Sequence, residues 1–312
     1  MRIKTKSILL LIALVNFSSV LFAQPDDLLS AVEKKSDQPK EYVNNAFKSS
    51  RVINAHSMEM IGKHVLDVRI LHRFGLINSG FNNFYGLDQA NMRFGFDYGL
   101  TKDLTIGIGR SNVNKEWDGF IKYRPIQQSI GGKHSSPVSV ILVSGATITT
   151  APWADPRRKN FFTSRMAFYN EFIVGRKFSE KFSFQISPTL VHLNIVDYES
   201  YTNNIFAIGL GARYKLSKRT AFVVDYHYIV RNNEDDAISN QYANMINPLS
   251  IGFDIETGGH VFQLHFSNST GMNEKAFITN TTNSWGKGEI RFGFNLSRVF
   301  TVGKKKEIPV KI

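Results

Sequence analysis

The feature of this chain that most limits its fold is a regular alternation of apolar and polar residues. In residues 90–100 every second residue is apolar, and those between are polar or glycine. Side chains on a strand alternate between its two faces with a period of two, so such a segment has one apolar face and one wet face. The pattern recurs about a dozen times along the chain and predicts an all-β protein.

The connections between these segments indicate which kind of β protein this is. Tight turns follow the second, sixth, eighth and tenth segments, a Gly- and Ser-rich link follows the fourth, and mostly longer loops fall between, with 112–115 as the exception. An even strand number with short turns at one end and long loops at the other is typical of outer-membrane barrels. The sequence therefore predicts an antiparallel transmembrane β-barrel of roughly 12 strands, with 10 or 14 as alternatives. A soluble β-sandwich or propeller has no reason to alternate its loop lengths. The predicted strands are roughly 64–74, 90–100, 104–111, 116–125, 137–148, 163–177, 182–193, 204–216, 220–230, 248–256, 260–267 and 288–298.

The N-terminus predicts export. A basic start, an apolar run from Ile8 to Val15 and the small residue Ala23 are the parts of a cleavable signal peptide. We expect residues 1–23 to be this signal, 24–63 to be an N-terminal extension in the periplasm or inserted into the lumen, 64–303 to be the barrel and 304–312 to be a basic tail. Asp26–Lys35 is predicted as a short helix. Phe47–Ile61 alternates only weakly, as an extra strand or as a segment folded into the lumen. The expected location is the outer membrane.

The amino-acid composition excludes several kinds of site and partner. The chain has no cysteine, which excludes disulfides, thiolate metal sites and a lipid-modified cysteine. Its net charge of +12 is spread over strand positions and the tail, which favours anionic lipid head groups over nucleic acid as the partner. No sequence motif calls for a cofactor.

Several stretches resemble an uncharacterised β-barrel family of Bacteroidota that is known only as a domain of unknown function. The resemblance covers most of the mature chain and implies an outer-membrane β-barrel fold, but no activity and no catalytic residues. The matching stretches are Phe47–Asn54, His72–Gly75, Phe84–Asp88, Gly107–Ser111, Trp153–Pro156, Lys177–Phe182 and Pro188–His192.

The strand faces opposite the apolar ones are unusually ionic. Such residues fill a barrel with paired charges, which is the favoured interpretation, or line a narrow pore whose charges set its selectivity. If the first and last strands close the barrel, we expect Asp67 and Arg69 to lie near Glu289 and Arg291. The predicted lumen-lining residues are Asp67, Arg69, Arg73, Arg93, Asp97, Lys122, Arg124, Arg213, Asp225, His227, Asp254, Glu256, His265, Glu289 and Arg291.

The histidines suggest two kinds of chemistry, the first of which is metal binding. Asp225, His227, Asp254 and His265 share lumen parity on neighbouring strands, and carboxylate with imidazole can bind a divalent metal. Hydrogen-bonded polar residues are the favoured interpretation, so no metal is predicted.

The second is hydrolysis, which would need a serine, a histidine and an orienting group at one height on the outward face. His72 and His192 have outward parity, but neither has an identifiable serine partner. The chain also lacks a Gly-x-Ser-x-Gly elbow, a His-Glu-x-x-His motif and a phosphate loop. We therefore do not expect an enzyme.

Two long loops stand out. Residues 267–287, rich in Asn and Thr, either fold into the barrel as a constriction or form a flexible surface loop. Loop 149–162 is restrained by two prolines and is the loop we expect to recognise a ligand, if any does.

The sequence thus predicts an outer-membrane barrel that passes or binds small solutes. A plugged structural or partner-binding barrel is the alternative, and an outer-membrane hydrolase is the least favoured. The expected partners are outer-membrane lipid and a small solute, with no nucleic acid. The oligomeric state is left open.

Overall fold

The computed structural model describes residues 39–153, 156–157, 159–231 and 236–303. The predicted signal peptide, the helix at 26–35 and the tail from 304 lie outside these residues. The chain divides into two compact units, of which residues 42–129 and 136–312 form the larger and residues 1–41 and 130–135 the smaller. β1 (Glu41–Tyr42) and β6 (Ser129–Ile130) are two-residue strands outside the barrel.

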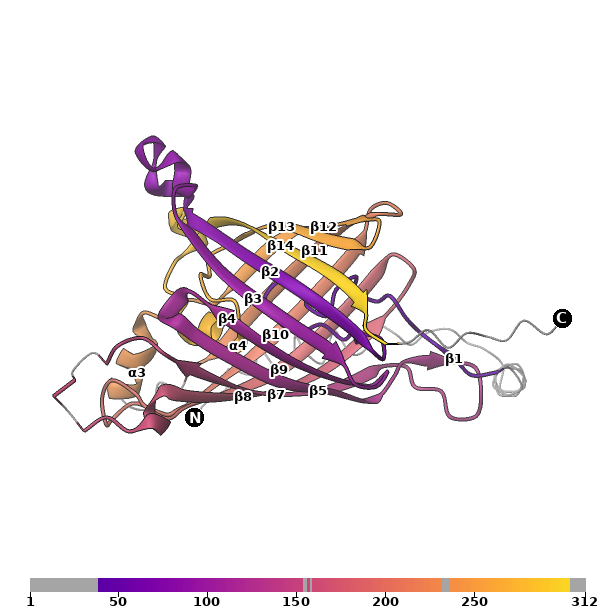
Figure 1. Ribbon diagram of the computed structural model, residues 1–312, viewed down its shortest axis with the longest axis horizontal. Coiled ribbons are helices and arrows are strands. Elements are labelled where there is room, and N and C mark those ends of the chain that lie inside the picture. The colour runs from indigo at the N-terminus through magenta and orange to yellow at the C-terminus, as the bar shows by residue number, and fades with distance from the viewer. Residues whose placement is uncertain (1–38, 154–155, 158, 232–235, 304–312) are drawn as a thin grey trace, which may run out of the picture. The chain divides into compact units, whose positions relative to one another are not determined.

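The larger unit is a closed barrel of 12 antiparallel strands, as predicted (Figure 1). Each strand pairs with its neighbour along the chain, and the last strand pairs with the first. The strands are β2 (Val65–Leu76), β3 (Ala90–Gly99), β4 (Leu104–Ser111), β5 (Glu116–Ile126), β7 (Ser139–Thr149), β8 (Met166–Lys177), β9 (Phe182–Leu193), β10 (Asn204–Lys215), β11 (Thr220–Val230), β12 (Leu249–Thr257), β13 (His260–Ser267) and β14 (Arg291–Thr301).

The closing register corrects one expectation. β14 runs antiparallel to β2, so Asp67 lies opposite Val299 and Arg69 opposite Ser297. The start of β14 is at the other end of the barrel, where Arg291 pairs with Leu76. The prediction that Asp67 and Arg69 approach Glu289 and Arg291 was therefore wrong, because it ignored the opposite strand directions.

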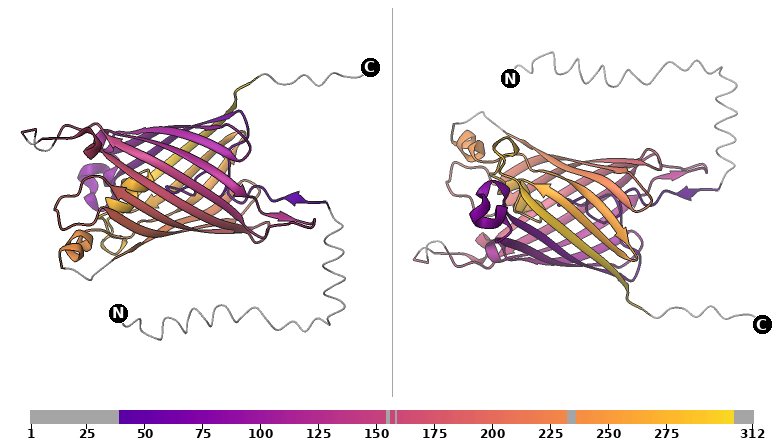
Figure 2. Two further views of the ribbon diagram at one scale, coloured as in Figure 1. Left: turned by 90° about the horizontal axis from the view of Figure 1, so that it is seen from below. Right: turned by 90° about the horizontal axis from the view of Figure 1, so that it is seen from above.

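The two ends of the barrel differ in their connections (Figure 2). At the turn end the strands are joined by 100–103, 127–138, 178–181, 216–219 and 258–259. At the loop end they are joined by 77–89, 112–115, 150–165, 194–203, 231–248 and 268–290. The loop end also carries the two described helices, α3 (Asp236–Ala243) and α4 (Glu274–Thr279), and 3₁₀ turns such as Phe81–Gly86 and Phe162–Arg165.

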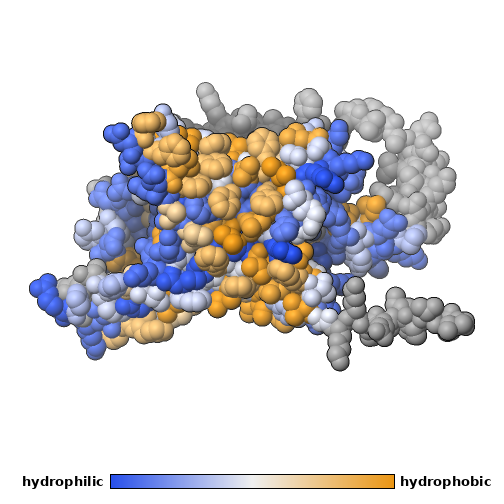
Figure 3. All heavy atoms as spheres, turned by 45° about the horizontal axis from the view of Figure 1, so that its top comes forward, coloured by the Kyte–Doolittle hydropathy of each residue, from blue (hydrophilic) through white to orange (hydrophobic). Residues whose placement is uncertain are grey.

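The outward faces of the strands form an apolar belt. Phe94, Phe96 and Ile121 are 45%, 48% and 55% exposed, although such side chains are buried in most soluble proteins. Figure 3 shows apolar side chains across the middle of the wall and hydrophilic ones towards both ends. An apolar band flanked by polar rims fits a barrel surrounded by lipid.

No helix in the described part of the chain is long and apolar enough to cross a membrane.

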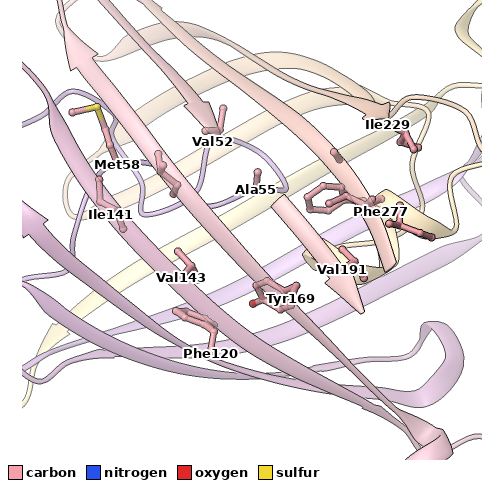
Figure 4. Close-up of a cluster of buried hydrophobic side chains, with 14 of the residues drawn as sticks. Val52, Ala55, Met58, Phe120, Ile141, Val143, Tyr169, Val191, Ile229 and Phe277 are labelled. Atoms are coloured by element: carbon pink, nitrogen blue, oxygen red, sulfur yellow. The ribbon is translucent and has the colours of Figure 1, made fainter. Parts of the chain in front are cut away.

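The core of the protein lies inside the barrel. Residues 46–61, which we name the N-terminal insert, enter before β2 and are almost entirely buried. Figure 4 shows Val52, Ala55 and Met58 of this insert among inward-facing strand residues such as Ile141 and Val143. The interior is therefore occupied by the chain itself.

Inward-facing glycines make room for this insert. A Cβ atom added to Gly211 on β10 would lie 2.9 Å from Val52 Cγ2, and one added to Gly175 on β8 would lie 2.5 Å from Met58 Sδ. Both distances are shorter than real contacts. The alternation of the strands thus places its smallest residues where the insert comes closest.

Candidate functional site

The centre of the N-terminal insert is a short hairpin. Arg51 and His56 form an antiparallel bridge, and Val52 N–H donates to Ala55 O at 2.9 Å. Of the two alternatives expected for Phe47–Ile61, the extra strand does not form, because backbone groups of this segment bond to strand side chains instead of to a ladder. Buried backbone groups need such partners, and the barrel wall supplies them.

The tip of the hairpin is held by one carboxylate. Asp225 Oδ2 on β11 accepts the backbone N–H groups of Ile53, Asn54 and Ala55 at 3.3, 2.7 and 3.0 Å. Hydrogen bonds to an ionised acceptor are stronger than neutral ones. Asp225 is thus the principal anchor of the tip.

The carbonyl and side-chain groups of the tip are held by other strands. Gln263 on β13 donates to Val52 O at 2.6 Å, and Asn295 on β14 donates to Ile53 O at 2.9 Å. The Asn54 carboxamide accepts from Arg73 at 2.6 Å and donates to Ser250 Oγ at 3.0 Å.

The two arms of the insert are held in the same way. Lys122 on β5 donates to the carbonyls of Ser50 and Glu59, at 3.1 and 2.6 Å. Gln185 on β9 bonds both His56 O and Met58 N–H, at 2.7 and 2.8 Å. Arg69 donates to Ser49 Oγ at 2.6 Å and Arg213 donates to Ala46 O at 3.4 Å. The insert thus hydrogen-bonds side chains of eight of the twelve strands.

A second segment fills the lumen from the loop end. Residues 268–281, which we name the loop insert, are largely buried and carry α4. The Asn273 side chain caps α4 by accepting Ala276 N–H at 2.8 Å, and Phe277 is fully buried. The long loop between β13 and β14 therefore folds into the barrel and is not a surface loop.

Glu116 at the start of β5 fixes α4 to the wall. Its two carboxylate oxygens accept from Asn273 Nδ2 and Lys275 Nζ, each at 2.7 Å. Glu116 is buried, and the Lys275 side chain is 16% exposed.

The two inserts meet at a buried ion pair. Arg51 Nη1 of the N-terminal insert lies 2.7 Å from Glu274 Oε1 of α4, and both side chains are almost completely buried. Arg51 Nη2 lies 3.2 Å from His56 Nε2, whose ring packs edge-on against Phe120. Burial and the nearby Arg51 and Lys122 cations hold the pKa of His56 well below its usual range, so this imidazole is neutral.

Glu59 is the acidic residue of the N-terminal insert. Its carboxylate accepts the backbone N–H of Ala46, and burial raises its pKa above the usual value against that hydrogen bond. The pKa values of His56 and Glu59 thus move in opposite directions.

Most of the predicted lumen-lining residues lie buried on the inner wall. They fall into ion pairs and hydrogen bonds with one another or with the N-terminal insert. Asp67 and Arg69 pair at 2.8 Å, Arg69 and Asp97 at 3.3 Å, and Asp225 and His227 at 3.4 Å. Asp254 accepts from Gln263 at 2.9 Å, whereas both ring nitrogens of His265 lack a partner among the described residues. Arg73, Lys122 and Arg213 bond the insert as described above, and Arg93 pairs with Asp118 at 2.5 Å.

Four predicted residues lie at the ends of the barrel instead. Arg124 pairs with Asp103 at 2.8 Å, and Glu256 pairs with Lys48 at 2.7 Å, both at the turn end. Glu289 precedes β14 and accepts Ser284 N–H at 2.8 Å, so it belongs to the loop and not to a strand. Arg291, the first residue of β14, donates to Phe74 O at 3.2 Å.

The described residues contain no group of three or more His, Asp or Glu side chains placed to hold a metal ion. His72 stacks on Phe294 with ring centroids 4.9 Å apart, and His192 Nδ1 lies 2.8 Å from Asn204 Oδ1. Neither imidazole has a serine hydroxyl within hydrogen-bonding distance in the part of the chain that the structure describes.

Sequence reasoning missed Arg51 and Glu274, which join the two inserts, and Glu116, which fixes α4 to the wall. The available signals were weak: Arg51 lies in the Phe47–Asn54 stretch that carries the family resemblance, and Glu274 lies in the Asn- and Thr-rich loop. Neither segment has a periodic pattern of apolar residues that would predict its burial.

The two inserts leave a small vestibule on each side. The loop-end vestibule, about 270 Å³, is bounded by Arg165, Tyr201, Gln241, Met245 and Lys275. The turn-end vestibule, about 380 Å³, is bounded by Lys48, Glu59, Asp67, Glu256 and His260. Loop 149–162 contributes Thr149, and the guanidinium carbon of Arg165 lies 3.7 Å from the ring centroid of Trp153.

The lipid-facing belt, the closed strand order and the polar, filled interior define a membrane-bound β-barrel. Residues 47–300 match the family model described as "Membrane bound beta barrel domain (DUF5777)". The chain belongs to this family, and the matched region begins within the N-terminal insert and ends in β14.

Solved structures with a similar trace include porins and channels. The NanC porin aligns at a TM-score of 0.47 with 10% identity, over 76% of this chain and 98% of that one. Salmonella typhi OmpF in complex with daunomycin aligns at 0.35 with 8% identity, over 76% and 97%. The CymD monoaromatic hydrocarbon channel aligns at 0.34 with 9% identity, over 78% and 90%. No curated protein matches the chain.

Proposed function

We propose that this protein is an outer-membrane barrel for small solutes that is closed at rest and opens when the N-terminal insert leaves the lumen. The loop end would face the cell exterior, since long loops lie outside and short turns in the periplasm in such barrels. The observation that carries the proposal is the hydrogen-bonded insert, residues 46–61, which borders the turn-end vestibule and meets, at the Arg51–Glu274 pair, the loop insert that borders the loop-end vestibule.

The way the insert is held supports reversible closure. Its bonds run to separate side chains on eight strands, so no continuous backbone ladder has to be broken. Each such bond contributes about 0.5–1.5 kcal/mol net, because water satisfies the same groups once they are released. Polar groups such as Lys48, Ser49, Ser50 and Arg51 would also be hydrated readily in the periplasm.

The vestibules support a small solute. A water molecule occupies about 30 Å³ of liquid, so the 270 Å³ loop-end vestibule has room for about nine water molecules, or for a solute of about as many heavy atoms. Its wall combines the cations Arg165 and Lys275 and the carboxylate of Asp197 with amide and apolar side chains. A solute with both a polar and an apolar side fits such a lining.

The second candidate is a permanently plugged structural or partner-binding barrel. The completely buried Arg51–Glu274 pair favours it, since breaking such a pair is costly. The two candidates differ in whether the N-terminal insert leaves the lumen of the folded barrel and a conducting path then opens.

Full-length protein in planar bilayers tests this choice. Gly211→Val places new atoms against Val52 and is expected to expel the insert, giving single-channel current where the native protein is silent. Gly119→Val is the matched control, because the nearest atom to its added Cβ is 3.6 Å away.

The position of the insert is read separately by a thiol. Ser57 is fully buried and the chain has no cysteine, so the thiol introduced by Ser57→Cys should react with a maleimide only when the insert is out. If the Ser57→Cys thiol reacts in the Gly211→Val background but no current flows, the solute barrel is rejected in favour of the structural barrel. Steady current through the native protein would instead overturn closure at rest.

A further inference from the structure

The lipid-facing belt is interrupted at the middle of two neighbouring strands. Outward residues of β7 are apolar from Val140 to Ile148 except for Ser144, and those of β8 from Met166 to Val174 except for Asn170. Ser144 and Asn170 lie directly opposite each other in the ladder. Both side chains are exposed, and neither makes a hydrogen bond among the described residues. An amide without a partner in hydrocarbon is unfavourable.

The backbone is irregular beside this pair. Pro188 on β9 has no N–H to donate, and pairing between β8 and β9 is interrupted from Glu171–Thr189 to Val174–Ile186. Proline is disfavoured inside a paired strand for this reason. The wall therefore carries unsatisfied polar side chains and a gap in its ladder at neighbouring positions.

The same place is hollowed. A depression of about 590 Å³ is lined by Ser144 and Asn170 together with Ile121, Leu142, Pro188 and Leu190. Exposed rings of Phe172 and Phe206, 45% and 41% exposed, form part of its lining. It lies on the face of β7 and β8, which come to the front in the left view of Figure 2.

We propose that a second copy of this chain covers this depression, with Asn170 and Ser144 of the two copies bonding across a two-fold axis normal to the membrane. Two copies inserted in the same orientation carry Asn170 at the same depth, so the axis brings like residues together. A carboxamide both donates and accepts, so it is complementary to itself. A lipid acyl chain fills the hollow but offers neither a donor nor an acceptor.

The absence of cysteine makes crosslinking the sharpest test. Ser144→Cys, which keeps the Asn170 carboxamide, is placed in the full-length protein in vesicles of phosphatidylethanolamine and phosphatidylglycerol and is expected to oxidise to a covalent species of twice the chain mass. The control is Leu264→Cys on β13, which is lipid-facing, 39% exposed and five strands from β8 around the barrel. It is expected to stay monomeric at the same protein-to-lipid ratio.

Three results would overturn the proposal: monomers from both variants, dimers in equal yield from both, or a crosslink to a different protein in native membranes. A cysteine-free measurement completes the test. Asn170→Leu improves the match to lipid and so keeps the barrel folded, but it removes the self-complementary group. Its mass in mild detergent, by analytical ultracentrifugation, is expected to fall from dimer to monomer. A native protein that is already monomeric there, or a variant that stays dimeric, contradicts the interface.

Discussion

The two segments that fill the barrel differ in how they are held. The N-terminal insert bonds mainly through its backbone to strand side chains, with Asp225 accepting three N–H groups, and it also buries Phe47, Val52 and Met58 in the apolar core. The loop insert places Phe277 and Ile278 in the same core and fixes itself through Glu116. Hydrogen bonds to the wall exchange readily for bonds to water, whereas the buried apolar surface of both segments does not. Under the proposed function, the N-terminal insert is the segment that leaves the lumen and α4 is the stop that stays in place.

The largest effect is expected from removing the anchor of the hairpin. Asp225→Ala leaves three buried N–H groups without an acceptor, at about 1–3 kcal/mol each, so the N-terminal insert should leave the lumen. Maleimide labelling of Ser57→Cys should then go from protected to complete. Asp254→Ala is the control, since its carboxylate bonds Gln263 and not the insert. Equal labelling in both variants would show that Asp225 is not the principal anchor of the hairpin.

The second-largest effect is expected from breaking the ion pair between the two inserts. Glu274→Gln leaves the buried Arg51 guanidinium without its counter-charge and should weaken docking of the N-terminal insert by about 3 kcal/mol, the low end for a broken buried pair. The double variant Arg51→Gln with Glu274→Gln should recover part of this loss, because the pair couples the two inserts. Labelling of the Ser57→Cys thiol in the parent, the two single variants and the double variant gives the coupling free energy between Arg51 and Glu274. Strict additivity would show that the two inserts are independent.

A smaller effect is expected at the clamp of α4. Lys275→Met removes one of the two bonds to Glu116, and the pair is partly exposed, so we expect a loss of about 1–2 kcal/mol in the stability of the loop insert. Hydrogen exchange of the α4 amides should quicken while the Ser57→Cys thiol stays protected. If that thiol became reactive as well, α4 would not be a stop independent of the N-terminal insert.

The smallest effect is a dependence on pH. The pKa of His56 is well below 6.5 when the N-terminal insert is docked and near 6.5 when it is released, so above that pH neither state binds the proton and His56 contributes nothing. Below it only the released state is protonated, and docking weakens as pH falls. Labelling of the Ser57→Cys thiol, corrected for the reactivity of a free thiol at each pH, should rise between pH 7 and pH 5, and His56→Gln should flatten this rise. Glu59, whose pKa is raised on docking, acts in the opposite sense and stays in both proteins.

The outer wall was predictable in detail, and its exceptions show why. β3 was expected at 90–100 and spans Ala90–Gly99, because alternation is a local property of one strand. The last strand was expected at 288–298 but spans Arg291–Thr301, since Glu289 folds back onto Ser284 in the loop. The odd or even position of each residue along its strand correctly separated the apolar outer face from the ionic inner face. It could not tell which ionic residues would bond one another and which would bond the insert.

The sequence by itself determined the wall: the strand number, the strand faces, the alternation of turns and loops, and the absence of any cysteine chemistry. Only the tertiary structure decided what fills the barrel. Arg51 and Glu274 are 223 residues apart, and they meet because one segment enters from the turn end and the other from the loop end. Alternation records which side of a strand faces inward. The segment that fills the interior is held by hydrogen-bond partners on eight separate strands. No local sequence pattern predicts that set of partners.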